Sequence, residues 1–325
     1  MSFAALEEAV RDARNIAIVG HGKPDSDCIG SVVGTALYLR AVYPDAVVIP
    51  LLEDFHEKFG ILEGAKEARQ ELPEGFTPDL LIVCDCSEAY RIGAGSELAE
   101  AGIRTVVIDH HATNAGFGDE AVVRPESSST CEVLFTLMDH EKISKDCAAC
   151  LYAGIVGDTG VFRHSCTSPA TMRVAASLME YGINAHAIIR ATYDLHSFAE
   201  NQILGAVLSS AVTALDGQVV FGTATRQMMA ECGVTPKHLD GIVDHLINVV
   251  GVKAAVFMYE TEPGVFKASL RSGEEIAVSE AAKAFGGGGH LRAAGCTLAM
   301  GAPEARYRLT QVLGSLLKES GGQAK

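Results

Sequence analysis

In the first half of the chain, short and continuously apolar runs alternate with stretches of helical periodicity. The runs lie at residues 16–20, 47–51, 80–84 and 105–108. Continuous apolar runs between helices indicate strands that are covered on both faces, which is typical of a parallel sheet. The pattern becomes mostly helical over residues 129–189. We therefore expect an α/β fold whose N-terminal domain is built on a parallel sheet.

A second alternating unit follows a polar helical stretch. The predicted division is an N-terminal domain at 1–188, a helical linker at 189–212 and a smaller C-terminal α/β domain at 213–325. The strands predicted for the C-terminal domain lie near 219–224, 253–259, 265–270 and 294–298. Its predicted helices lie near 238–249, 276–285 and 304–318.

The charge and the hydropathy exclude several classes of protein. The net charge of −15 argues against binding of long DNA or RNA, because proteins that bind long nucleic acids present a basic face to the phosphates. The longest strongly apolar run, 147–157, is shorter than the roughly 20 residues that span a membrane. Residues 1–15 have the pattern of an amphipathic helix rather than of a signal peptide.

The nine cysteines form no regular framework, which favours a reduced, cytoplasmic protein. Cys147 and Cys150 form a CxxC motif, but no second Cys/His pair follows at zinc-like spacing. Because the motif lies on an apolar helical stretch, we predict that both thiols are buried packing groups.

The loop after the first predicted strand contains three possible metal ligands within seven residues, namely His21, Asp25 and Asp27. Ligands of open α/β sheets gather at the carboxyl ends of strands, and this loop is such a place. Asp25 and Asp27 could instead cap the following helix. Gly30 is predicted to open that helix closely against the sheet.

Two further strands end in the same kind of residue. Asp85 follows the run 80–84, and the triplet Asp109-His110-His111 follows the run 105–108. A buried cluster of carboxylates would be destabilised by repulsion and desolvation, and divalent metal ions would remove this problem. Asp158 ends another apolar segment between two glycines, although a turn aspartate is the alternative there.

These motifs together resemble the DHH phosphoesterase family. The matching segments are HGKPDSDCIGS at 21–31, VCDCS at 83–87, IDHH at 108–111 and GIVGDTG at 154–160. SLRS at 269–272 and FGGGGHLRAAG at 285–295 resemble the DHH-associated domain of oligoribonucleases and of 3′-phosphoadenosine-5′-phosphate (pAp) phosphatases. Ser26, Cys28 and Leu291 depart from residues common in the family, and none of these departures removes a ligand.

The resemblance implies two divalent ions of the Mn²⁺ type. The residues that it implies for the first metal position are His21, Asp25 and Asp85. Those for the second metal position are Asp27, Asp85, His110 and Asp158, so that Asp85 is shared. Mixed carboxylate and imidazole ligands suit Mn²⁺ and related ions, and they do not form the thiolate site that is typical of zinc. Asp109 would orient a histidine, and His111 would face the substrate phosphate.

The resemblance also implies that the C-terminal domain binds a terminal phosphate, with the active site in the cleft between the two domains. Backbone N–H groups of a glycine run can approach an anion without side-chain clash. The implied substrate-binding residues are Arg271, Gly287, Gly288, Gly289 and His290. The expected partner is a short oligonucleotide or nucleotide rather than long DNA or a membrane. The sequence does not decide whether the chain also forms a homodimer.

The leading function is hydrolysis of short oligonucleotides, of pAp, or of both. Alternatives are cleavage of linear or cyclic dinucleotides and, less favoured, a nucleotide-sensing module without catalysis. An inorganic pyrophosphatase is disfavoured because its lysine-rich signature is absent, and a RecJ-type exonuclease because the chain is short and acidic. Thr130 is predicted to be a helix N-cap, with a substrate contact as the alternative.

Overall fold

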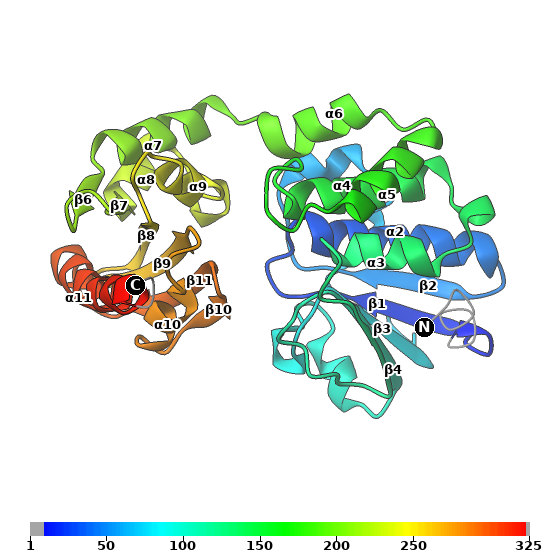
Figure 1. Cartoon of the computed structure of the whole chain (residues 1–325). Helices are drawn as coiled ribbons and strands as arrows, with labels where there is room; N and C mark the ends of the chain where they lie inside the picture. Colours follow the sequence, from blue (N-terminus) through cyan, green and yellow to red (C-terminus); the bar gives the residue numbers. More distant parts are fainter. Residues whose placement is uncertain (1–9, 323–325) are drawn as a thin grey trace. The chain divides into compact units, whose positions relative to one another are not determined.

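The computed structural model describes residues 10–322 (Figure 1). Most of the predicted N-terminal helix at 1–15 lies outside this range. The chain divides into two compact units, one up to Leu195 and one from His196 onward. No helix in the described range is long and apolar enough to cross a membrane.

The N-terminal unit contains a five-stranded, entirely parallel sheet, which confirms the predicted sheet type. Its strand order is β2-β1-β3-β4-β5. The strands are β1 (Asn15–Val19), β2 (Val47–Leu51), β3 (Leu80–Cys84), β4 (Arg104–Asp109) and β5 (Glu120–Val123). Strand β5 lies outside the predicted runs, because it is short and only one of its residues is fully buried.

Both faces of this sheet are covered, as its apolar runs predict. Ile16 and Ile18 of β1 belong to the core under the helices, whereas Ala17 and Val19 belong to a separate cluster on the opposite face. Figure 1 shows α2, α3, α4 and α5 on one side of the sheet. The helices are α2 (Ser26–Val42), α3 (Thr130–Leu137), α4 (Lys145–Asp158), α5 (Pro169–Glu180) and α6 (Ala185–Ile189).

Helices α2 and α4 pack closely, and this contact corrects the prediction for Gly30. Gly30 lies inside α2 rather than at its start, and a Cβ placed there would lie 2.5 Å from the carbonyl oxygen of Cys150 in α4. The glycine therefore serves a helix–helix contact and not a helix–sheet contact. Cys147 and Cys150 are both fully buried in α4, which confirms that they are packing thiols.

Short helical turns complete the N-terminal unit and continue into the next. They are η1 (Glu57–Ile61), η2 (Ala65–Glu67), η3 (Ala89–Arg91), η4 (Ser96–Glu100), η5 (His140–Lys142), the π-helical η6 (Arg190–Asp194) and, in the C-terminal unit, η7 (Pro236–His238).

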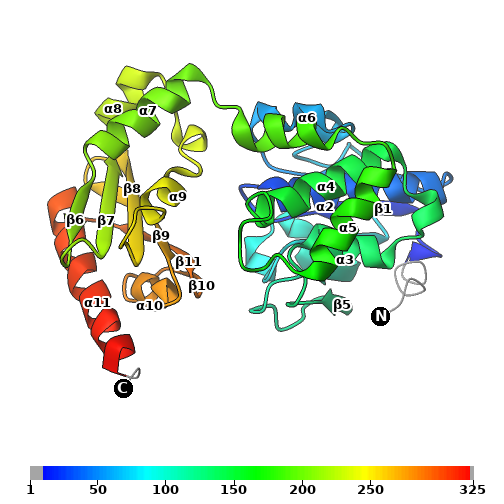
Figure 2. The same cartoon turned by 45° about the horizontal axis from the view of Figure 1, so that its top comes forward.

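The C-terminal unit is built on a six-stranded mixed sheet with the order β10-β11-β9-β8-β7-β6. Only the pair β7–β8 is parallel. The strands are β6 (Val212–Ala214), β7 (Val219–Ala224), β8 (Ala254–Glu262), β9 (Val265–Ser272), β10 (Gly288–His290) and β11 (Ala293–Leu298). Its helices are α7 (Phe198–Ser209), α8 (Arg226–Cys232), α9 (Ile242–Ile247), α10 (Val278–Lys283) and α11 (Ala302–Gly322), seen in Figure 2.

Two hydrophobic clusters lie on the two faces of this second sheet. One joins the strands to α10 and α11, and the other joins them to α7, α8 and α9. Ile203 and Val207 of α7 are fully buried in the second cluster. Helix α7, which falls within the predicted linker, therefore packs as part of the C-terminal unit.

Candidate metal centre

Side chains from three neighbouring parallel strands meet at one edge of the first sheet. His21 comes after β1, Asp85 after β3 and His110 after β4. The Nε2 atom of His21 lies 3.5 Å from Asp85 Oδ2, and the Nε2 atom of His110 lies 3.7 Å from Asp85 Oδ1. Asp85 therefore stands between the two histidines, with one carboxylate oxygen toward each.

Asp85 has a backbone conformation that is uncommon for a residue with a side chain. Its φ is +56°, and its N–H donates to the carbonyl oxygen of Ile108 in the adjoining strand β4. Strained conformations of this kind persist where the surrounding structure enforces them, and aspartate tolerates them better than most residues. Only 2% of Asp85 is exposed, so its position is fixed by packing as well.

Asp25 caps α2 and also lies near His21. Its Oδ1 accepts hydrogen bonds from the N–H groups of Asp27 and Cys28, which makes it the N-cap of α2. Its Oδ2 lies 3.7 Å from Nε2 of His21. Because different oxygens are involved, capping does not prevent Asp25 from contributing an oxygen to the centre.

Asp27, in the first turn of α2, is fully buried against the N-terminus of α3. Its two carboxylate oxygens accept hydrogen bonds from the backbone N–H groups of Thr130 (2.7 Å) and Cys131 (3.0 Å). The prediction that Thr130 is the N-cap of α3 is wrong, because Ser129 caps the helix through the N–H of Glu132. The Thr130 hydroxyl instead donates to Asp85 Oδ1 at 3.1 Å.

Asp158, the last residue of α4, completes the group. Its Oδ2 lies 3.2 Å from Nε2 of His110. Asp27, His110 and Asp158 each offer a ligand atom within 4.8 Å of the others'. The structure thus brings together all six predicted ligands, which lie just after β1, β3 and β4, at the start of α2 and at the end of α4.

Concentrated negative charge dominates the electrostatics of this group. Burial, followed by the nearby Asp85 carboxylate, raises the pKa of Asp27 to about 7. Burial and the neighbouring carboxylates also raise the pKa of Asp158 well above its ordinary value. Burial opposes protonation of His21, but Asp25 and Asp85 outweigh it and raise the His21 pKa to about 12. Divalent cations would offset this charge, and the oxygen and imidazole donors fit ions such as Mn²⁺.

His111 is held by a chain of hydrogen bonds beside the six predicted ligands. Its Nδ1 lies 2.7 Å from Oδ1 of the fully buried Asp109, and Asn114 Nδ2 donates to the other Asp109 oxygen at 2.7 Å. Burial opposes ionisation of Asp109, but the hydrogen bond with His111 outweighs it and lowers the Asp109 pKa to about 2. Asp109 thus orients His111, which itself lies 3.6 Å from Asp85 Oδ1.

The predicted phosphate-binding residues gather in the C-terminal unit. Gly288 to His290 form the edge strand β10, and the backbone positions of His290, Ala293 and Arg271 are in register across β10, β11 and β9. A Cβ at Gly287 would lie 2.1 Å from the Gly295 carbonyl oxygen, so only glycine fits. Gly289 has φ +141°, which also requires glycine. The guanidinium of Arg271 lies 3.4 Å from Asp244 of α9.

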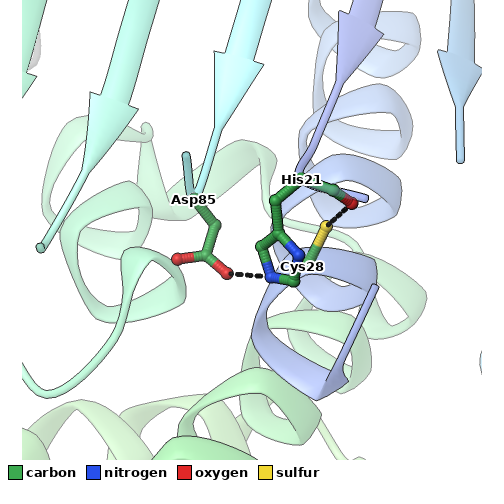
Figure 3. A group of neighbouring side chains, drawn as sticks. All are labelled: His21, Cys28 and Asp85. Atoms are coloured by element: carbon green, nitrogen blue, oxygen red, sulfur yellow. Dashed lines mark hydrogen bonds and ion pairs between the residues drawn. The ribbon is translucent and has the colours of Figure 1, made fainter. Parts of the chain in front are cut away.

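The contacts of Asn114 and Cys28 near the centre were not predicted from the sequence. Asn114 reaches Asp109 through a turn after the DHH triplet, and no spacing rule predicts that contact. Cys28 offers a ligand atom within 4.8 Å of those of His21 and Asp85 (Figure 3). A signal for Cys28 was present, since a thiol stands within the same segment as His21, Asp25 and Asp27.

Comparisons with known proteins identify the family of both units. The model of the DHH family N-terminal domain matches residues 15–155, and that of the DHHA1 domain matches residues 216–319. The bifunctional oligoribonuclease and PAP phosphatase NrnA of Thermus thermophilus is 32% identical over 286 residues, covering 87% of this chain and 84% of that protein.

Two further similarities concern a solved structure and a longer enzyme. The crystal structure of an exopolyphosphatase-related protein from Bacteroides fragilis matches with a TM-score of 0.89 and 25% identity, covering 98% of this chain and 97% of that one. The cyclic-di-AMP phosphodiesterase PdeA of Listeria monocytogenes is 24% identical over 88% of this chain, which spans 45% of that enzyme.

The parallel sheet, the ligand cluster at its edge and the second domain define a hydrolase of phosphoester bonds. The chain belongs to the DHH family and carries the DHHA1 domain in addition.

Proposed function

We propose that the protein hydrolyses short oligonucleotides and pAp with two divalent metal ions, of the Mn²⁺ type. The observation that carries this proposal is the position of Asp85, whose two oxygens face His21 and His110 at 3.5 and 3.7 Å. The paired ions of two-metal phosphatases and nucleases lie about 3.5–4 Å apart, so one carboxylate with an oxygen toward each histidine could serve both positions. The first metal position would use His21, Asp25 and Asp85, and the second Asp27, Asp85, His110 and Asp158.

The residues around the centre suit in-line hydrolysis. Two bound ions supply hydroxide near neutral pH and offset charge on the phosphoryl oxygens. Asp85 holds the two positions in a fixed relation, and the Thr130 hydroxyl holds Asp85. His111, oriented by Asp109, would place positive charge against a phosphoryl oxygen of the substrate.

Substrate length would be set in the C-terminal unit. We assign binding of a terminal phosphate to the backbone N–H groups of Gly287, Gly288 and Gly289, together with His290 and Arg271. A single clamped phosphate favours a short substrate, in agreement with the net charge of −15. The similarity to the Thermus enzyme supports oligoribonucleotides and pAp as substrates. The nine free cysteines are compatible with the cytoplasm, where we place the protein.

The similarity to the Listeria enzyme favours one second candidate, the hydrolysis of cyclic dinucleotides by the same centre. This alternative uses the same metal positions and differs in the absence of a terminal phosphate on the substrate. Arg271→Ala therefore distinguishes the two, because it should raise the KM for pApA and leave that for a cyclic dinucleotide unchanged.

The test is a comparison of initial rates on pAp, pApA, short DNA and cyclic di-AMP in the presence of Mn²⁺. Asp85→Ala should abolish hydrolysis of every substrate. The matched control Asp146→Ala removes an exposed carboxylate from the start of α4 and should retain full activity. Absence of product from the intact protein with every divalent ion tested would refute the proposed function.

A further inference from the structure

The thiol of Cys28 lies at the first metal position, beside two of its three predicted ligands. Figure 3 shows the side chain of Cys28 together with those of His21 and Asp85. One ligand atom of each residue lies within 4.8 Å of those of the other two. These residues come from the loop after β1, from the first turn of α2 and from the end of β3. The three donors thus meet through tertiary structure.

The surroundings hold the sulfur atom in this place. Cys28 is fully buried, and its Sγ lies 3.8 Å from the carbonyl oxygen of His21. A Cβ at Gly20 would lie only 2.3 Å from this sulfur, so the thiol occupies the space that a side chain at Gly20 would need. A side chain at residue 20 is therefore excluded while the thiol keeps this position.

The spacing of these atoms is compatible with coordination of one ion. Zn²⁺ binds sulfur at about 2.3 Å and imidazole nitrogen or carboxylate oxygen at about 2.0–2.2 Å, so ligand atoms of a tetrahedral site lie about 3.5 Å apart. The His21–Asp85 and His21–Asp25 distances of 3.5 and 3.7 Å already have this value. The sulfur would need to approach by little more than about 1 Å.

We propose that Cys28 is a fourth protein ligand of the first metal position, and that this position therefore prefers Zn²⁺ or Co²⁺ to Mn²⁺. Thiolate is a soft ligand that favours zinc and similar ions, whereas Mn²⁺ prefers oxygen donors. On coordination, the sulfur gives its proton to solvent and its electron pair to the metal ion. The second metal position has only oxygen and imidazole donors, which suit Mn²⁺. This inference rests on the proposed metal centre.

The test uses the absorption spectrum of the full-length protein during titration with Co²⁺. A Co²⁺–thiolate bond gives a ligand-to-metal charge-transfer band in the near ultraviolet, which oxygen and imidazole ligands do not produce. The wild type should show this band, and Cys28→Ala and Cys28→Ser should lose it while they keep the visible d–d bands of bound Co²⁺. Both variants should bind Co²⁺ at least tenfold more weakly, with less than a threefold change for Mn²⁺.

The matched control is Cys86→Ala. Cys86 is also buried and adjoins Asp85, but its thiol donates to the Glu88 carbonyl oxygen. This variant should keep the charge-transfer band. A band that disappears in Cys86→Ala and persists in Cys28→Ala would assign the ligand to the wrong cysteine and overturn the proposal.

The experiment also separates this inference from the proposed function. Wild-type protein that hydrolyses pApA with Mn²⁺ and binds Co²⁺ without a charge-transfer band would overturn the role of Cys28 and leave the phosphoesterase intact. Protein that neither hydrolyses pApA nor binds Co²⁺ would overturn both. The serine variant keeps nearly the volume of the thiol, so its circular dichroism spectrum shows whether loss of the band reflects loss of a ligand or loss of the fold.

Discussion

The backbone N–H of Thr130 donates a 2.7 Å hydrogen bond to Asp27, 103 residues earlier in the chain, while its hydroxyl donates to Asp85 at 3.1 Å. Thr130→Val removes only the second of these bonds. We expect Asp85 to become less well positioned, with a roughly tenfold loss in kcat and weaker Mn²⁺ binding. Thr130→Ser should restore both quantities.

Thr136→Val is the control for this change, since it removes a hydroxyl from the opposite end of the same helix. It should lower stability at most and leave Mn²⁺ affinity unchanged. Equal kinetic constants for Thr130→Val and Thr130→Ser would show that the hydroxyl does not position Asp85.

The bond between Asp109 and His111 gives a second prediction. Asp109→Asn keeps the size of the side chain but removes the charge that orients the ring, so kcat should fall by about 10–100-fold with little change in KM. Isothermal titration with Mn²⁺ should still give two ions per chain. A loss of one ion in this variant would mean that Asp109 is itself a ligand.

Metal removal should destabilise the protein in a pH-dependent way. The pKa of Asp27 in the folded, metal-free protein is raised to about 7, against about 3.9 in an unfolded chain. Its contribution to stability is therefore present below about pH 4 and is lost as the pH rises through about 7. Bound cations reverse this loss, so the increase in Tm on addition of Mn²⁺ should be larger at pH 8 than at pH 5. A larger increase at pH 5, measured by thermal denaturation, would contradict the assignment of Asp27 as a ligand.

The contact between α2 and α4 makes Gly30 sensitive to substitution. Gly30→Ala would place a methyl group 2.5 Å from the Cys150 carbonyl oxygen and should lower the free energy of unfolding by about 1–3 kcal/mol in urea denaturation. Gly205→Ala is the control, because it adds the same methyl group at an exposed position of α7 with no atom within 4 Å. This control should stabilise the protein by up to about 1 kcal/mol.

Much of the N-terminal sheet was predictable because its strands are buried on both sides. The runs at 47–51 and 80–84 coincide with β2 and β3, because recognisable turn residues mark both ends of these apolar runs. Strand β10 was not predicted, because Gly288 and Gly289 carry no side chains that could give a period of two. Helix α9 begins later and ends earlier than the predicted 238–249. A separate helical turn, η7, includes the first residue of the predicted helix.

The gathering of the predicted ligands was predictable for a related reason, whereas the contacts that support them were not. Parallel strands bring their carboxyl ends to one edge, so Asp85 and His110 could be placed together from the sequence alone. The roles of Thr130 and Asn114 depend on where α3 and the loop after β4 arrive in space. Ser129 caps α3 instead of Thr130, and for this reason the Thr130 hydroxyl donates to the Asp85 carboxylate rather than to the helix.

The spacing of the gathered side chains along the chain has a consequence for protein synthesis. His21, Asp25 and Asp85 have all been translated long before α4, whereas Asp158 is the last residue of that helix. Domains fold as units during synthesis. Because the Asp85 N–H donates to Ile108 and the Thr130 hydroxyl donates to Asp85, Asp85 reaches its final position only after α3 has been added, so the side chains of both predicted metal positions come together late and as one group.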